Sequence, residues 1–172
     1  PEITALWHRL ALAETAPPRG AGDTEAAVTG RVDHLLNAGA LDQAEALLDT
    51  LRPLSKPLFR RAFDVGLLAG RANAACNEMR ANPALSPSIK ARIFCLARGN
   101  DWAAAALTLT TAETLGQISR QEADLIARFL DPDLFENEPP PPPSDVLSAL
   151  EFTMREALVL PRATGTLPLA FL

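Results

Sequence analysis

The stretch Leu36-Asn-Ala-Gly-Ala-Leu-Asp-Gln-Ala44 decides the fold, because a glycine turn stands there between two segments with the apolar spacing of helices. In the preceding segment, Thr24–Ala38, apolar residues recur three and four positions apart, and Asp23 stands where an N-cap is expected. The following segment, Leu41–Leu51, has the same spacing. Gly39 can adopt the left-handed conformation that ends a helix. The stretch therefore predicts two antiparallel helices.

A related stretch, Leu96-Ala-Arg-Gly-Asn-Asp-Trp-Ala-Ala104, follows later in the chain. Glycines spaced by 31 and 29 residues, each followed five positions later by alanine, mark three turns: Gly39 with Ala44, Gly70 with Ala75, and Gly99 with Ala104. A small alanine lets two helices approach closely, and the glycine provides the tight turn. The pattern predicts helical hairpins repeating about every 30 residues.

Over residues 24–116 this pattern resembles the tetratricopeptide-repeat class, in which a glycine turn and a following small alanine recur. The resemblance implies an α-solenoid of stacked antiparallel hairpins and carries no binding residues over. The spacing falls short of the usual 34 residues and the chain has no Tyr. The alternative is a helical bundle rich in Ala and Leu, in which the recurrence is coincidental.

Composition favours an all-α fold. The 172 residues include 31 Ala and 28 Leu but only 10 Val and Ile together, too few β-branched residues to fill the faces of a sheet. The net charge of −5 and the absence of a long basic run argue against nucleic-acid binding. No segment reaches the ~18 consecutive apolar residues of a membrane-spanning helix.

The remaining elements follow from apolar spacing and from start and stop signals. Further helices are expected at Pro57–Ala69, Ala72–Asn82, Pro87–Arg98, Trp102–Leu115, Ser119–Leu130 and Ser144–Val159. Ser86 and Ser144 are expected to cap the helices that follow them, and Ser119 to open a capping box. Their apolar residues are expected to form the core, including Trp102 and Ala106.

The sequence divides into a helical-hairpin repeat domain over 1–136, an acidic and proline-rich linker over 137–144, and a carboxy-terminal helix and tail over 145–172. That helix is expected to pack on the repeat or to lead into a missing region. Pro139–Pro143 predicts a stiff polyproline II segment. It is interpreted as a spacer or surface strap; the alternative is a ligand for a proline-recognising module.

Cys76 and Cys95 are the only cysteines. They lie on either side of the turn near Asn82–Ser86, at distances that place them at similar heights in an antiparallel hairpin. One interpretation is a disulfide, which would indicate an oxidising compartment such as the bacterial periplasm or cell envelope. The other is a pair of buried thiols in a cytoplasmic protein. The preference for Arg over Lys and the high Ala content fit a GC-rich bacterial genome.

No motif predicts catalysis, a cofactor or a metal site. His8 and His34 are the only histidines and lie 26 positions apart, without the spacing of metal ligands. Four acidic residues precede the prolines but lack the spacing of a calcium loop, and a solvated acidic loop is expected there. These residues are Asp131, Asp133, Glu136 and Glu138.

The function expected from these features is a non-catalytic scaffold for protein–protein interaction, with a protein partner and no nucleic acid. The apolar ending Leu-Pro-Leu-Ala-Phe-Leu172 favours a fragment of a larger bacterial protein. One alternative is a helical accessory domain of an enzyme whose catalytic domain lies elsewhere, as in some cell-wall lytic enzymes. Another is a stand-alone enzyme that uses carboxylates in a helical cleft. The oligomeric state is left open.

Overall fold

A computed structural model describes residues 2–13, 24–160 and 167–171 of the chain. Within these ranges the chain is helical and contains no strand, as the composition predicts. The α-helices are α1 (Glu2–Leu12), α2 (Thr24–Asn37), α3 (Leu41–Asp49), α4 (Lys56–Leu68), α5 (Ala72–Ala81), α6 (Ile89–Arg98), α7 (Trp102–Thr114), α8 (Arg120–Leu130) and α9 (Ala149–Ala157). Short 3₁₀ turns are η1 (Pro83–Leu85), η2 (Pro132–Phe135) and η4 (Leu169–Phe171). None of the described helices has the length and apolar character needed to cross a membrane.

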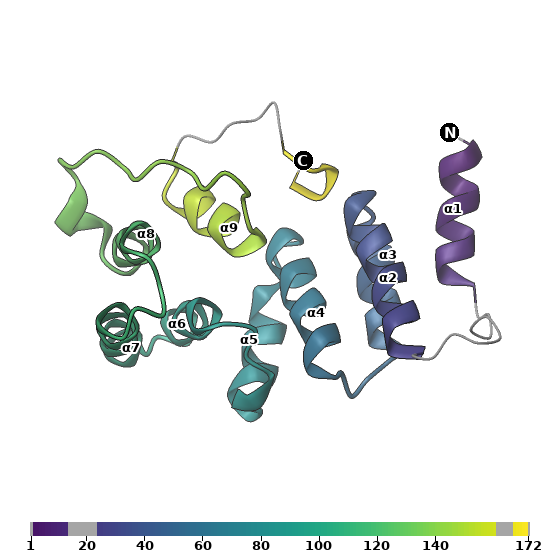
Figure 1. Cartoon of the computed structure of the whole chain (residues 1–172), viewed down its shortest axis with the longest axis horizontal. Helices are drawn as coiled ribbons and strands as arrows, with labels where there is room; N and C mark the ends of the chain where they lie inside the picture. Colours follow the sequence, from purple (N-terminus) through teal and green to yellow (C-terminus); the bar gives the residue numbers. More distant parts are fainter. Residues whose placement is uncertain (1, 14–23, 161–166, 172) are drawn as a thin grey trace.

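Each helix packs against the next along the chain, so that α1 to α8 follow one another across the molecule (Figure 1). Contacts also join alternate helices, namely α1 with α3, α2 with α4, and α6 with α8. Helix α9 then turns back and packs against α4 and α8, and η4 packs against α2. The carboxy-terminal part of the chain thus covers the middle of the helical series.

The first two glycine turns have the predicted left-handed conformation. Gly39 and Gly70 both have φ of 71°. At each turn two backbone N–H groups bond back to the end of the preceding helix: Ala40 N to Leu35 O and Gly39 N to Leu36 O, then Arg71 N to Gly66 O and Gly70 N to Leu67 O. This is the Schellman arrangement, which satisfies carbonyls that the helix end leaves free.

The third turn has the same hydrogen bonds one residue later than predicted. Gly99 has an ordinary φ of −85°, and the left-handed residue is Asn100, with φ of 62°. Asparagine tolerates this conformation better than most residues with a side chain. The alanine five positions on is then Ala105, which is fully buried, whereas Ala104 is half-buried. The third turn is therefore Asn100 with Ala105.

Three helix starts test the predicted caps. Ser119 forms the predicted capping box: its hydroxyl accepts from the Glu122 N–H, and the Glu122 carboxylate accepts from the Ser119 N–H. The other two predicted caps are wrong. The cap of α6 is Ser88, because Ser86 instead donates its hydroxyl to Ser88 O at 3.0 Å.

The cap of α9 is Ser148, and the predicted Ser144 is wrong for a similar reason. The Ser144 N–H donates to Glu151 Oε1 at 3.0 Å, which holds the chain outside the helix until Ser148 accepts from the Glu151 N–H. The predicted N-cap Asp23 lies outside the described residues.

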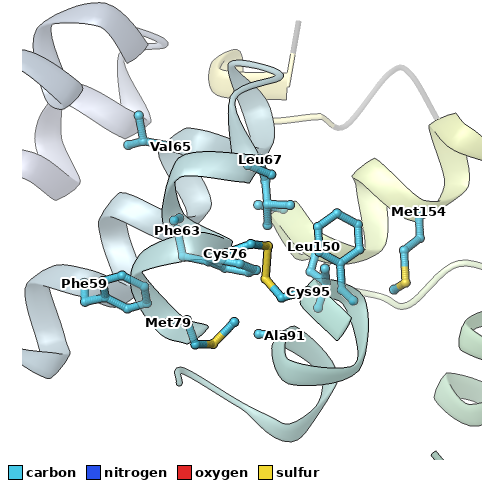
Figure 2. Close-up of a cluster of buried hydrophobic side chains, with 14 of the residues drawn as sticks. Phe59, Phe63, Val65, Leu67, Cys76, Met79, Ala91, Cys95, Leu150 and Met154 are labelled. Atoms are coloured by element: carbon cyan, nitrogen blue, oxygen red, sulfur yellow. A yellow bond between two sulfur atoms is a disulfide. The ribbon is translucent and has the colours of Figure 1, made fainter. Parts of the chain in front are cut away.

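The core is one continuous cluster that reaches from the first helices to α9. Figure 2 shows its centre, where side chains of α4, α5, α6 and α9 meet. Phe59 and Phe63 of α4 are almost completely buried, and burial of one such side chain contributes about 2 kcal/mol. Cys76 of α5 and Cys95 of α6 lie in this centre at disulfide-bonding distance, with their Cα atoms 5.2 Å apart.

Candidate functional site

The outer face of α7 is apolar and exposed. Helix α7 buries Ala105, Leu109 and Ala112, which lie along its inner face. The prediction that Trp102 and Ala106 belong to the core is wrong, because both lie on the exposed side, where Trp102 is 48% exposed and Leu107 is 70% exposed. The helix therefore has a second apolar stripe that no described segment of the chain covers.

The threonines of α7 make this face less polar than its composition suggests. Each threonine hydroxyl donates to the carbonyl four residues earlier, at 2.6 to 3.1 Å: Thr108, Thr110, Thr111 and Thr114. These hydroxyl donors are used within the helix. The only charged residue of α7 is Glu113. Small, uncharged side chains of this kind allow another helix to pack closely.

The acidic and proline-rich segment 137–144 runs beside α8, and we call it the strap. Prolines have no N–H, so only the carbonyls of such a segment can form backbone hydrogen bonds. Arg128 donates to the carbonyls of Glu138 at 3.2 Å and Pro139 at 2.9 Å, and Gln121 donates to that of Pro142 at 2.8 Å. Three donors thus hold the segment against the helix.

A second buried arginine completes the attachment of the strap. Arg155 of α9, 2% exposed, donates to Pro141 O at 2.9 Å and to Glu151 Oε1 at 3.0 Å. The two buried charged residues among those described are Arg128 and Arg155, and both bind strap carbonyls. The guanidinium of Arg128 also lies 4.8 Å from the centre of the Phe135 ring, a cation–π contact. These hydrogen bonds therefore hold the strap in one position against α8 and α9.

An open groove of about 770 Å³ lies between α7, α8 and the strap. Leu109 and Thr110 of α7 form one side, Ala123 and Ala127 of α8 form the floor, and Phe135 lies on the strap side. Thr110 also belongs to the exposed face of α7, so the groove and that face are continuous. The exposed face of α7 and the groove together form an extended, mainly uncharged surface, which we call the α7 surface.

Acidic groups border this groove. Glu113, Asp124 and Glu138 line it, with Arg120 as the basic residue among the lining side chains. Asp124 and Glu138 lie 3.1 Å and 3.5 Å from the Arg128 guanidinium. Glu113 is exposed on α7 and adds a negative charge to this border.

A smaller cavity of about 120 Å³ lies under the other side of the strap. Its charged lining groups are paired, Lys90 with Glu122 and Arg155 with Glu151. The pKa of Glu122 is lowered from 4.5 to about 2, chiefly by the hydrogen bond from Lys90 and also by those from the Ser119 N–H and hydroxyl, whereas partial burial raises it. Lys90 and Glu122 link α6 to α8, and Arg155 and Glu151 pair within α9, so each charged group that lines this cavity has a partner of opposite charge.

Among the residues considered for metal binding, the structure describes the side chains of His34 and of the four acidic residues before the prolines. His34 is exposed on α2, and the side chain of His8 lies outside the described part of the molecule. Among the described residues no three or more His, Cys, Asp or Glu side chains form a group that could hold an ion. The four acidic residues before the prolines are all exposed: Asp131, Asp133, Glu136 and Glu138.

One carboxyl group titrates near neutral pH. The pKa of Asp64 on α4 is raised from 3.8 to about 6, chiefly because the carboxyl is buried; Arg60 and Arg61 oppose this rise and the nearby Asp33 adds to it. A shifted carboxyl can mark an active site. Asp64 lines none of the cavities described here, and the guanidinium of Arg61 is bound to Asp33 by two hydrogen bonds of 2.9 Å. Asp64 therefore bears on stability.

Replacing Asp64 by Asn should stabilise the protein at neutral pH. The raised folded-state pKa means that the contribution of the protonated group is complete below about pH 4 and is lost as the pH rises through about 6. We expect Asp64→Asn to raise the free energy of unfolding by about 2 kcal/mol at pH 7.5 and to leave it unchanged at pH 4. Urea denaturation at both pH values measures this. An equal effect at both values would contradict the assignment.

The sequence did not indicate the α7 surface. Its signals are Leu107, the run of threonines and the near absence of charge on α7, and these become informative only once the buried face is known. A second exposed apolar stripe lies on α1, at Ile3, Leu6 and Leu10, and these residues line none of the cavities described here. No protein-family model matches the chain, and no curated protein or solved structure shows significant similarity to it.

Proposed function

We propose that this chain is a non-catalytic scaffold that binds a partner protein, built as a short α-solenoid of stacked helical hairpins. Three observations support the solenoid: consecutive helices pack on each other, α1 touches α3, α2 touches α4 and α6 touches α8, and the turns at Gly39, Gly70 and Asn100 share one hydrogen-bond pattern. Proteins of this architecture commonly present extended surfaces to partners.

The observation that carries the binding function is the uncovered apolar face of α7. An exposed, contiguous apolar surface next to a groove is typical of an interaction site. The occupant we propose is an amphipathic helix of the partner. Its apolar side chains would pack on Trp102, Leu107 and the small residues between them, and would enter the groove. Glu113 favours a basic residue on the partner beside that apolar stripe.

The test places a charge in the centre of the α7 surface. Leu107→Asp should weaken partner binding at least about tenfold, because the aspartate loses its hydration when the interface forms. The matched control is Leu6→Asp on α1, where the leucine is 66% exposed, similar to the 70% of Leu107. Tagged wild-type protein and both variants are purified from the cells that produce the chain, and the proteins retained are compared.

A protein retained by the wild type and by Leu6→Asp, but lost with Leu107→Asp, supports the proposal. The opposite pattern would assign binding to α1 and overturn it. Retention of the same proteins by all three would also overturn it. Circular dichroism of the variants checks that each still folds, which is expected because both leucines are exposed.

A further inference from the structure

A basic cleft adjoins the disulfide and shares no lining residue with the groove beside α7. Four residues of α5 share one face of the helix because they are spaced by three, four and seven positions: Asn73, Cys76, Asn77 and Arg80. On α6, Arg92 lies three positions before Cys95 and is on the same side of that helix. The disulfide joins these two faces: it packs into the core, and polar and basic residues of both helices line cavities beside it.

Two cavities lie in this cleft, one on each side of Arg80. The first, of about 200 Å³, is lined by Arg80 and Arg92 above an apolar floor that includes the disulfide and Leu96. The second, of about 190 Å³, is lined by Arg80 and Arg98 together with two asparagines. The two cavities share Arg80 and Cys76, and among the described residues no carboxylate lines either one.

The charges of these arginines are oriented without being neutralised. Arg80 Nη1 donates to Asn77 Oδ1 at 3.0 Å, and Arg98 Nε donates to Asn73 Oδ1 at 2.8 Å. An amide oxygen fixes a guanidinium but brings no negative charge, and its own N–H groups stay available as donors. Within residues 24–160, five other arginines have carboxylate partners, whereas none pairs with Arg80, Arg92 or Arg98. The paired ones are Arg52, Arg61, Arg71, Arg128 and Arg155.

Gly99 lets Arg80 reach over the end of α6. A Cβ atom at position 99 would lie 2.8 Å from Arg80 Nη2, so any side chain there would displace the guanidinium. The φ of Gly99 is one that other residues adopt, and the conformation of the turn therefore does not require glycine. The space beside Gly99 is occupied by the end of the Arg80 side chain.

We propose that this basic cleft binds a small organic anion through its phosphate or carboxylate group. Guanidinium groups bind such oxyanions with paired, charge-assisted hydrogen bonds. Arg80 and Arg92 face the cavity with the apolar floor, which suits an anion that carries a small apolar body. A site with three uncompensated arginines in a chain of net charge −5 is a local attraction for anions. This binding is separate from the proposed partner surface on α7.

Calorimetric titration of the full chain at low salt tests the proposal with two probes, inorganic phosphate and succinate. We expect saturable binding of at least one probe with a dissociation constant of about 1 mM or lower. Arg80→Gln and Arg92→Gln should each weaken it at least about tenfold. The matched control is Arg60→Gln on α4, which removes an exposed arginine earlier in the chain than the cleft residues. It should change the dissociation constant of the probe less than about twofold.

Each outcome of the titration either supports or overturns anion binding in the basic cleft. Binding of either probe that depends on Arg80 and Arg92 supports the cleft, and the probe that binds more tightly identifies the oxyanion. Gly99→Ala provides a second variant that keeps every charge but displaces the Arg80 guanidinium, and it should also weaken binding. Absence of saturable binding of both probes up to about 10 mM would overturn the proposal. Equal weakening by Arg60→Gln would overturn it as well.

Discussion

Arg155→Ala is expected to lower the free energy of unfolding by about 3 to 5 kcal/mol, a typical cost of leaving a buried charge without its partner. Arg155 is 2% exposed, and its loss would leave Pro141 O without a donor and the Glu151 carboxylate, whose side chain is 12% exposed, without its cation. The strap would lose one of its attachments to α9. Chemical denaturation of the variant at neutral pH measures the loss.

Two further variants separate the buried charge from simple loss of packing. Arg155→Met with Glu151→Leu removes both charges and should cost less than Arg155→Ala alone, because no unpaired ion is left behind. Arg120→Ala removes an exposed arginine and should change stability by less than about 0.5 kcal/mol. If Arg155→Ala lowered the free energy of unfolding no more than Arg120→Ala does, the account of the strap would be wrong.

Removing the disulfide should have the second largest effect on the free energy of unfolding. Cys76 and Cys95 are separated by 19 positions and link two consecutive helices inside the core. In the chain-entropy account, closing a loop of this length stabilises the folded state by about 3 kcal/mol. We therefore expect the double variant Cys76→Ala, Cys95→Ala to unfold at lower urea concentration, with a free energy of unfolding lower by about that amount.

The control for the disulfide is the reductant. Dithiothreitol should destabilise the wild-type protein by a similar amount and leave the double variant unchanged. An unfolding curve of the wild type that does not respond to the reductant would contradict a stabilising disulfide. The same chemistry bears on location, because a disulfide persists in an oxidising compartment. Intact mass under non-reducing conditions, on protein taken from its native compartment, shows whether the bond is present there.

The helices could be predicted from the sequence because their signals are local. Apolar spacing and glycine turns lie within one or two turns of the helix they define, and Gly39, Gly70 and the capping box at Ser119 follow from neighbouring residues alone. The shift from Gly99 to Asn100 was not predictable from the motif. Gly99 lies against the guanidinium of Arg80, a residue on another helix, and in the sequence it looks like a turn glycine.

The candidate site could not be predicted, because it depends on which side of a helix is buried. Helix α7 is apolar on nearly every side, and such a sequence predicts a helix enclosed by neighbours. Its neighbours cover only the face with Ala105 and Leu109. The position of the strap beside the groove could not be predicted either. It depends on the hydrogen bond from Arg155 to Pro141 O, and Pro141 lies 14 positions earlier in the chain.

Site-specific photo-cross-linking from α7 tests the central claim most directly. A photoreactive residue is placed at Ala103 or Ala106, both exposed on α7, or at Ala26, exposed on α2, and the chain is irradiated in the cells that produce it. The account predicts one discrete protein adduct from both α7 positions and none of that size from Ala26. Adducts from Ala26 alone, or no adduct from either α7 position, would contradict it.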